Sequence, residues 1–452
     1  MTQTLPPKPL SRPEKVSLWR YGRLFRRDIL SAQPEKLYRA WMAEFRTPFF
    51  HSFMANDPDI VRMVLKERPY DFPKSDRIGE GLRPLLGRSV FLTNGETWAR
   101  QRRIIDPAFE GGRLRDTHSA MVSAAQAFAD RLSAQAGDVL DIEPDASHAA
   151  ADVIFRTLFS LPIEHEMAAA TYAAFRTYQR TQPILNLAAF LPLPRWVPRG
   201  FRPGTKRAAA DIRRLIRDLT DARHREIEAG TAPKDLATKI MTAVDPETGE
   251  GFDVAEMVDQ VAIFFLAGHE TSASTLGWAL YLLALYPEWQ EKLAQETASV
   301  DLQDFSALSK LQLTRDVFRE TLRLYPPVPM MVRQAAKQDS FRNRYVPCGA
   351  QLVLSPWHLH RHQRLWDNPD GFDPSRWHSE NGKDCARRAF IPFSAGPRVC
   401  PGAGFAMNEG VIMLAAVLRD LRVELTDRAP PMPVAHLTVR SESGIWLRVV
   451  RR

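Results

Sequence analysis

The residue with the clearest chemical potential is Cys400, in the segment FSAGPRVCPG at residues 393–402. Gly396 and Pro397 predict a tight turn before the cysteine. The apolar run after Gly402 predicts a helix through Leu418, which places Cys400 at a helix N-terminus. Backbone amides and the helix dipole stabilise a thiolate there, and a thiolate is a metal ligand. A lone cysteine beside a turn is more often structural, so its role depends on what accompanies it.

The second candidate is the segment AGHET, residues 267–271, inside an apolar run from Asp253 to Tyr286. Its length predicts one long helix. His269 and Glu270 interrupt the run, and a carboxylate inside a membrane span costs about 3 kcal/mol on insertion scales. A buried helix lining a site explains the run better, because a buried ionisable pair needs a partner or a function. Thr271 by itself would be expected to bond the carbonyl one turn back.

The third candidate is the pair Glu320 and Arg323, three residues apart on one helix face, where an ion pair can form. The helix that carries them is predicted over Leu308–Leu324 and is stopped by Pro326 and Pro327. Such a pair, taken alone, is typical of a solvated helix surface.

The rest of the chain predicts a mostly helical protein with small sheets. Helical spacing covers Thr117–Gln135 and Thr205–Ala229, and β-type runs cover Gln351–Ser355 and Ala435–Val450. No stretch rich in Gly and Ser divides the 452 residues, so we expect one domain over residues 1–452.

Composition limits the class of function. The net charge is +8, from 61 basic and 53 acidic residues, but no basic stripe with interleaved aromatics predicts a nucleic-acid partner. Three cysteines argue against a disulfide framework and favour a reducing, cytoplasmic compartment. Met1–Pro13 lacks an apolar signal core. We interpret the basic, partly amphipathic Ser17–Leu30 as a solvated first helix rather than a membrane-surface or transit segment.

Together, the cysteine segment, the Ala-Gly-x-acid-Thr segment and the Glu–Arg pair resemble the cytochrome P450 family, in its soluble bacterial type. Chance would produce the Phe, Gly, Arg, Cys and Gly spacing of residues 393–402 on the order of once per ten thousand chains of this length. The resemblance follows the family's order from about Leu85 to Val450 and is loose over residues 1–30. It implies the family's mostly α prism with a small β-rich region.

The resemblance implies haem b as the cofactor, with Cys400 as the axial ligand to iron. Thiolate ligation favours cleavage of the O–O bond. The other residues that would hold the cofactor are Trp98, Arg102, Arg333, Phe393, Arg398 and Gly402. The chain departs from the usual pattern at Pro401, which has no N–H to donate to the sulfur.

The resemblance also implies roles around the cofactor. Thr271 and Glu270 would manage the protons that dioxygen reduction requires, through a relay rather than a single base. Ala267 and Gly268 would leave room over the iron. The substrate would contact apolar walls made by Phe264, Ala267, Val328, Met330 and Met331. Glu320, Arg323 and Arg376 would form a buried structural triad without a catalytic role.

The expected reaction is insertion of one oxygen atom from dioxygen into a lipophilic small molecule, by hydroxylation, epoxidation or dealkylation. The sequence does not identify the substrate. The alternatives are a peroxide-driven peroxygenase, a thiolate isomerase or a non-catalytic haem-binding sensor. The acid–threonine pair argues against all three.

Electrons are expected from a separate protein, because no Gly-rich dinucleotide unit is present and few residues follow Cys400. We expect a ferredoxin with its reductase, or a flavodoxin-like protein, acting on a monomer. A basic face would attract an acidic donor. That face is expected to present Arg100, Arg103, Lys383, Arg387 and Arg388.

One further pattern is the alternation of His358, His360 and His362, as a strand would need to place three imidazoles on one face. A copper or zinc site is conceivable. We do not favour it, because no cysteine or further histidine stands nearby.

Overall fold

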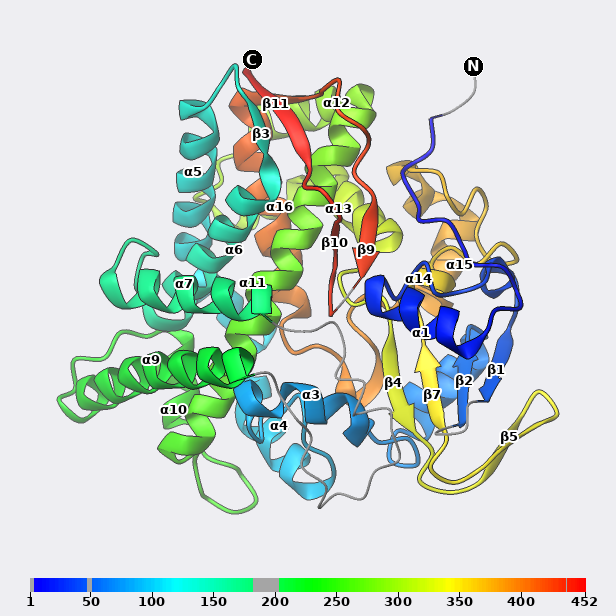
Figure 1. Cartoon of the computed structure of the whole chain (residues 1–452). Helices are drawn as coiled ribbons and strands as arrows, with labels where there is room; N and C mark the ends of the chain where they lie inside the picture. Colours follow the sequence, from blue (N-terminus) through cyan, green and yellow to red (C-terminus); the bar gives the residue numbers. More distant parts are fainter. Residues whose placement is uncertain (1–3, 47–50, 182–202, 436) are drawn as a thin grey trace.

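Helix α11, Val254–Leu285, runs through the middle of the computed structural model, which describes residues 4–46, 51–181, 203–435 and 437–452 (Figure 1). The prediction of one long helix over residues 253–286 is confirmed. Asp253 begins it with a capping box: its carboxylate accepts from Glu256 N at 2.7 Å, and the Glu256 carboxylate accepts from Asp253 N at 3.2 Å. Because α11 is apolar on nearly all sides, helices and strands pack against it along most of its length.

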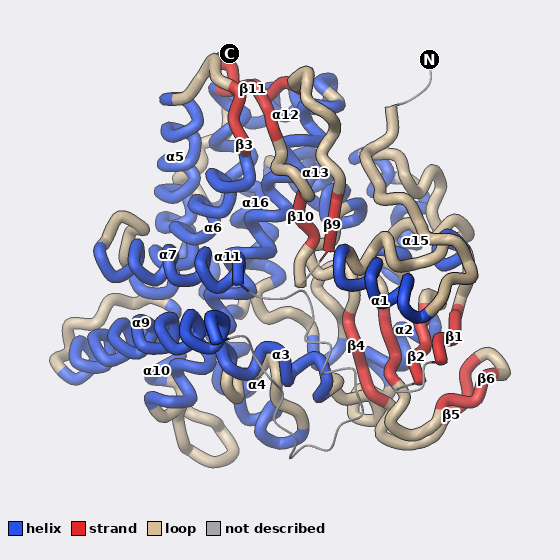
Figure 2. The backbone as a smooth tube through the Cα atoms, viewed as in Figure 1, coloured by secondary structure: helices blue, strands red, loops and turns tan. Residues whose placement is uncertain are grey.

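Helices account for most of the fold (Figure 2). Their bounds are α2 Pro58–Arg62, α3 Asp76–Leu86, α4 Gly95–Phe109, α5 His118–Ala134, α6 Ile142–Phe159, α7 Glu166–Thr181, α9 Pro203–Glu228, α10 Leu236–Thr242, α12 Pro287–Ala298, α13 Gln312–Leu324, α14 Pro356–Leu359, α15 Glu380–Arg388 and α16 Ala403–Asp420.

Three of these helices were predicted over nearly the same residues. The helices expected over 117–135 and 205–229 are α5 and α9, and the one expected after Gly402 is α16. The helix expected over Leu308–Leu324 is divided: a 3-10 turn ends at Lys310, and α13 begins only at Gln312. The break falls at Leu311, whose ψ of 55° leaves the helical region.

The largest sheet has the strand order β1-β2-β7-β4 and lies on the opposite side of the molecule from α5, α7 and α9 (Figure 1). Strands β2 and β7 are parallel, and the other pairs are antiparallel. The bounds are β1 Met42–Arg46, β2 His51–Ala55, β7 Gln351–Leu354 and β4 Met331–Gln334. The strand predicted over Gln351–Ser355 is therefore β7.

The β-type run predicted over Ala435–Val450 is broken into three strands, with β9 ending at Ala435. Strands β9 and β10 pair with each other, and β11 lies between β3 and β8. Strand β10 also lies against α11, where the Ser274 hydroxyl donates to Val439 O at 2.5 Å. The bounds are β3 Val139–Asp141, β8 Leu421–Leu425, β9 Pro433–Ala435, β10 Val439–Ser441 and β11 Trp446–Arg451, with the hairpin of β5 Asp339–Phe341 and β6 Arg344–Val346 apart from them.

The N-terminal segment contacts β9, where Ile29 N donates to Ala435 O at 3.1 Å. Its helix α1, Leu18–Arg27, corresponds to the predicted first helix, and Trp19 in it is 77% exposed. The Tyr325 hydroxyl donates to Pro7 O at 2.8 Å, which ties the segment to the core. Within the described residues, no helix combines the length and apolar character needed to cross a bilayer.

The three alternating histidines do not lie on a strand, which is the arrangement that would place all three imidazoles on one face. They belong to α14 and the turn after it, because Ser355 caps a helix there. Ser355 Oγ contacts His358 Nδ1 at 2.8 Å, and His360 Nε2 accepts from Ile391 N at 2.9 Å. Burial lowers the pKa of His358 and of His360 to about 3, so both rings are neutral packing elements. No metal-binding cluster of His, Cys, Asp or Glu occurs in the described part of the chain.

Candidate active site

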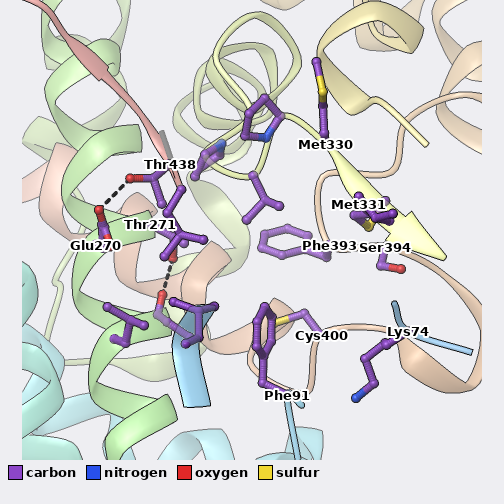
Figure 3. Close-up of a pocket in the computed structure, with 18 of the residues that line it drawn as sticks. Lys74, Phe91, Glu270, Thr271, Met330, Met331, Phe393, Ser394, Cys400 and Thr438 are labelled. Carbon is purple, nitrogen blue, oxygen red and sulfur yellow. Dashed lines mark hydrogen bonds between the residues drawn. The ribbon is translucent and has the colours of Figure 1, made fainter. Parts of the chain in front are cut away.

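A cavity of about 960 Å³ lies between α11, the cysteine segment and β4. Cys400 faces this cavity, with Phe91 and Phe393 beside it (Figure 3). All five predicted substrate-wall residues line it: Phe264, Ala267, Val328, Met330 and Met331. Further wall residues such as Phe91, Ile154 and Leu437 could not be predicted from the sequence, because they come from a loop, from α6 and from the turn before β10.

The turn before Cys400 depends on Gly396. Its φ is +68°, and a Cβ added there would lie 2.0 Å from Leu65 O, so only glycine fits. The chain then closes with Cys400 N donating to Phe393 O at 2.9 Å, and α16 begins just beyond Gly402. The turn therefore presents the cysteine sulfur to the cavity at the N-terminus of a helix.

The surroundings of Cys400 have opposite effects on the pKa of its thiol. Enclosure in the protein raises the pKa of its thiol, whereas a hydrogen bond from the Gly402 amide and the charge of Arg102 lower it. Pro401 cannot donate, so the donated amide comes from the next residue.

Cationic side chains gather at one side of the cavity. Lys74, Arg102, Arg333 and Arg398 all line it. Burial first, and then the charges of Arg398, Arg333 and Arg102, hold the pKa of Lys74 well below its usual range. Burial and the charge of Arg398 likewise lower the pKa of Arg333 to about 10.

Three of these four cations lack an anionic partner among the described residues. Arg102 pairs with Asp106 at 2.7 Å, but Lys74, Arg333 and Arg398 have no carboxylate partner among the described residues. The Nε of Arg398 is buried without any partner. Unpaired buried charge is costly. The two propionates of a haem would supply the missing anions, so the residues present fit that group, with Cys400 as its iron ligand.

Lys74 is a residue that sequence reasoning missed. It donates from Nζ to Val90 O at 2.6 Å, and this holds it beside Trp98. A single lysine after a proline carries no pattern that distinguishes it from a surface lysine. Only the contacts with the other cations reveal it.

The two predicted catalytic residues of α11 point in different directions. The Thr271 hydroxyl lines the cavity and donates to Ala267 O at 2.5 Å, which is the bond expected for a helical threonine. The Glu270 carboxylate accepts from the Thr438 hydroxyl at 2.7 Å (Figure 3). It also pairs with Arg440. Glu270 is only 8% exposed, and these partners come from β10 and the residue before it rather than from Thr271.

Gly268 and His269 serve the packing between α11 and α6. A Cβ on Gly268 would lie 2.3 Å from Ile154 Cδ1, so the space left by this glycine is occupied by Ile154. This revises the expectation that Gly268 leaves open room over the iron. His269 Nε2 contacts Ser147 Oγ at 2.7 Å, and burial lowers the pKa of His269 to about 3.

Glu409 on α16 is a second residue that sequence reasoning missed. It lines the cavity, is 2% exposed, and accepts from the Ser272 hydroxyl at 2.6 Å through Oε2, while Oε1 has no partner. Burial raises its pKa to about 8, so the side chain is largely a neutral acid at neutral pH. The available signal was a lone carboxylate in the otherwise apolar interior of α16.

Glu320, Arg323 and Arg376 lie together, away from the cavity wall. Arg323 donates to both oxygens of Glu320, at 2.9 and 2.8 Å, and Arg376 Nε donates to Glu320 Oε1 at 3.1 Å. Glu320 and Arg323 are fully buried. Arg323 also donates to Pro369 O and Gly371 O, so the cluster fixes the loop between α14 and α15.

All four arginines expected on a docking face form ion pairs, Arg387 and Arg388 with Asp384 and the two on α4 with carboxylates distant in sequence. Arg100 Nη1 lies 2.8 Å from Glu256 Oε1, and Arg103 Nε lies 2.6 Å from Asp245 Oδ1. Both join α4 to the segment at the start of α11. Their charges are neutralised internally, because the chain folds acidic residues of distant sequence onto α4.

Comparison with known proteins agrees with this geometry. The family model described as Cytochrome P450 matches residues 28–447. Cyclooctat-9-en-7-ol 5-monooxygenase of Streptomyces melanosporofaciens is 33% identical, over 84% of this chain and 82% of its own length. Cytochrome P450 4F12 of Homo sapiens is 30% identical, over 93% and 83%. The crystal structure of the cytochrome P450DA heme domain superposes with a TM-score of 0.83 over 99% of this chain and 98% of its own, at 23% identity, which shows the fold. The chain belongs to the cytochrome P450 family.

Proposed function

We propose that this haem-thiolate monooxygenase inserts one oxygen atom from dioxygen into a C–H or C=C bond of a lipophilic small molecule. One observation carries the proposal: a cavity that presents Cys400 at a helix N-terminus also presents buried cations without carboxylate partners. A planar dianionic group ligated through sulfur accounts for both features at once. The outcomes are hydroxylation, epoxidation or dealkylation, depending on the bond presented.

The cofactor is proposed to be haem b. Haem would supply the one-electron and dioxygen chemistry that amino-acid side chains cannot perform. Cys400 would ligate the iron. Gly402 lies beside the sulfur, since a Cβ added to this glycine would be 3.9 Å from Cys400 Sγ. The propionates would be held by Lys74, Trp98, Arg102, Arg333 and Arg398.

Protons are proposed to reach the site through α11. Thr271 presents a hydroxyl to the cavity, and its neighbour Ser272 donates to Glu409, which carries a proton at neutral pH. Glu270 is proposed as the second proton source, since it also lines the cavity, where its carboxylate pairs with Arg440. A relay of this kind is needed because two protons are consumed for each oxygen atom released as water.

The substrate class is proposed from the cavity wall. Phenylalanine, methionine, leucine and isoleucine side chains dominate the part above Cys400, and such a wall binds apolar molecules with few polar contacts. The relative from Streptomyces melanosporofaciens is named for a cyclic alcohol substrate, which makes lipophilic ring compounds the first ones to test.

The electron donor is proposed to be a separate ferredoxin, or a flavodoxin-like protein, that docks beside the cysteine segment. Lys66 lies against this segment, since a Cβ on Gly396 would be 3.1 Å from Lys66 Cα. Lys66 is exposed and has no ion pair among the described residues, unlike Arg100 and Arg103. We also propose a monomer acting in the cytoplasm, which the free thiols of all the cysteines support.

Two measurements test this function. The reduced protein with carbon monoxide should show the red-shifted Soret band of thiolate ligation, and Cys400→Ser should abolish it. Turnover of lipophilic compounds that change the haem spin state should require dioxygen and a reduced ferredoxin. Turnover with peroxide alone, and none with reductant, would assign the chain to the peroxygenases. No turnover under either condition would leave a haem sensor.

A further inference from the structure

Strand β10 forms part of the cavity wall but has little sheet of its own. Arg440 of this strand lines the cavity, as do Leu437 and Thr438 just before it. Within the described residues, β10 pairs only with β9, and Ser441 there faces Pro433, which has no N–H to donate. An isolated two-stranded ribbon is marginally stable in water, so contacts with other elements must hold β10 in place.

The end of β10 is attached to the start of α6. Glu143, in the first turn of α6, accepts from Ser441 N at 2.9 Å, although 298 residues separate the two. Asp141, the N-cap of α6, accepts from Ile445 N at 3.0 Å. Between these two amides, Gly444 has a φ of +84°, and a Cβ there would lie 2.7 Å from Asp141 Oδ2. Two neighbouring carboxylates therefore hold the turn between β10 and β11 by its backbone amides.

Helix α11 packs against the same point. A Cβ on Gly277 would lie 3.4 Å from Ile445 Cδ1 and 3.9 Å from Glu143 Cγ, so this glycine leaves room for both side chains. One turn earlier in α11, the Ser274 hydroxyl donates to Val439 O at 2.5 Å. Ser274 and Glu143 thus both hold the backbone of β10, and of these two side chains only Glu143 changes its charge with pH.

We propose that Glu143 is a positioning residue that holds the β10 wall of the substrate cavity through the Ser441 amide, and that the position of this wall therefore depends on pH. The inference rests on the proposed function, because β10 affects turnover as a wall of the substrate site. Glu143 itself is not among the described residues that line the cavity, so it acts on the substrate through β10.

The groups around Glu143 set the direction of this dependence. Burial raises the pKa of Glu143 to about 7, and the charge of Asp141 on β3 adds to this effect. The amide bond from β10 and the charge of Arg440 oppose it, but Arg440 forms its ion pair with Glu270. On the side of α11, Glu143 meets Gly277, which has no charge. Glu143 has no ion pair in the described part of the chain, so its ionised form is disfavoured while it is attached to β10.

Proton linkage gives the sign of the pH effect. The carboxyl group of Glu143 has a pKa of about 7 when attached, against an ordinary value of 4.5 when it is released into water. Attachment is therefore favoured most below the lower pKa, and the advantage is lost as the pH rises through the higher one. Between pH 6 and pH 8, the equilibrium for attachment should weaken about tenfold. Above neutral pH, the cavity has a less firmly held wall at β10.

Hydrogen exchange of the holoenzyme measures this attachment directly. The protection of residues 437–445, corrected for the intrinsic pH dependence of exchange, should fall about tenfold from pH 6 to pH 8 in the parent. Glu143→Gln keeps an oxygen acceptor for Ser441 N but cannot ionise, so its protection should be equal at the two pH values. Glu442→Gln is the matched control. It removes a charge from the same turn, where Glu442 forms an exposed pair with Arg27, and it should keep the parent's pH dependence.

Ligand binding tests whether the attachment matters for the cavity. The probe is 4-phenylimidazole, which carries an apolar ring on an iron-binding azole, and the shift of the Soret band gives its dissociation constant. The ratio of the parent's dissociation constant to that of Glu143→Gln should rise several-fold from pH 6 to pH 8, since the titration of the probe itself cancels in the ratio. Glu143→Ala, which lacks the acceptor, should bind the probe more weakly at both pH values while keeping its haem and its thiolate carbon monoxide spectrum.

The outcomes separate this role from a structural one. Protection in the parent that does not change with pH, or the same change in Glu143→Gln, would overturn the proposal. Loss of the pH dependence in Glu442→Gln would also overturn it, because any charge on the turn would then have the same effect. The expected exchange result with a constant ratio of dissociation constants would show that β10 is attached as described but does not shape the cavity, which contradicts the proposed role. A parent protein without the thiolate carbon monoxide spectrum would instead contradict the monooxygenase function, and the exchange result would still decide the attachment.

Discussion

The guanidinium of Arg398 lies over the indole ring of Trp98, with Arg398 Cζ 4.8 Å from the ring centroid. Arg398 comes from the cysteine segment and Trp98 from α4, so this contact joins the two parts of the chain that flank the proposed haem propionates. The indole face offsets part of the charge of Arg398. Lys74 lies in the same group of cations. Burial and the charges of three arginines hold its pKa well below its usual range.

Lys74→Met should weaken haem binding without lowering the stability of the apoprotein against unfolding. The substitution removes one positive charge from a cluster that repels itself when no anion is bound, so the apoprotein should be at least as stable as the parent. Haem should leave faster, because one propionate partner is lost. Haem transfer to a scavenging apoglobin and thermal unfolding of both apoproteins measure the two effects, with Lys383→Met as a surface control. An unchanged haem transfer rate would show that Lys74 does not contact the cofactor.

Glu320→Ala should destabilise the fold by about 3–5 kcal/mol, because it leaves Arg323 and Arg376 buried without their carboxylate. Asp384→Ala is the matched control, since it breaks an exposed pair with Arg388 and should cost less than about 1 kcal/mol. Urea unfolding and the haem content of the purified proteins check both. Equal stability of the two variants would show that the buried cluster contributes no more than a surface pair.

Thr271→Ala should divert electrons to peroxide while substrate binding is kept. Its hydroxyl lines the cavity, whereas the apolar walls that bind substrate are untouched. Thr220→Val is the control, because that buried hydroxyl on α9 makes the same kind of bond, to Ile216 O at 2.8 Å, but does not line the cavity. Product formed per electron consumed is the measurement. The same product yield in Thr271→Ala and Thr220→Val would show that the Thr271 hydroxyl only bonds Ala267 O.

Glu409→Gln should remove a pH dependence of stability. The pKa of Glu409 is raised from 4.5 to about 8 in the folded protein. A carboxyl group whose pKa is higher in the folded than in the unfolded state stabilises the fold at any pH below its unfolded-state pKa. This stabilisation is lost as the pH rises through the folded-state pKa. The parent should therefore lose stability relative to Glu409→Gln between pH 5 and pH 9, by on the order of a few kcal/mol. Unfolding in urea at several pH values measures the difference, and a constant difference would mean that Glu409 is ionised in the fold.

Lys66→Glu should slow reduction by an acidic ferredoxin by about tenfold at low salt, because it reverses a charge beside the cysteine segment that no carboxylate neutralises. Arg100→Glu should affect stability more than reduction, since Arg100 is paired with Glu256. Stopped-flow reduction at increasing ionic strength gives the salt dependence, which should weaken in Lys66→Glu. A reduction rate in Lys66→Glu that matches the parent at every ionic strength would place the docking face elsewhere.

The sequence by itself determined the family, through the resemblance of its motifs, and it determined the local elements that carry them. The turn at Gly396 and Pro397, the helix that follows Gly402, and the long apolar helix capped by Asp253 all form from residues close in the chain. Hydrophobic periodicity and turn residues act over short distances, so they can be interpreted without tertiary contacts. The same reasoning placed α5 and α9 within a few residues of their bounds.

Only the tertiary structure decided which charges are free and which are paired. Glu270 is attached to Arg440 across 170 residues, and Arg103 to Asp245 across 142, and no local pattern predicts such pairs. Lys74 and Glu409 stand out only because folding buries them at one cavity and shifts their pKa values in opposite directions. Burial and long-range charge set the behaviour of an ionisable group, and both depend on neighbours that are distant in sequence.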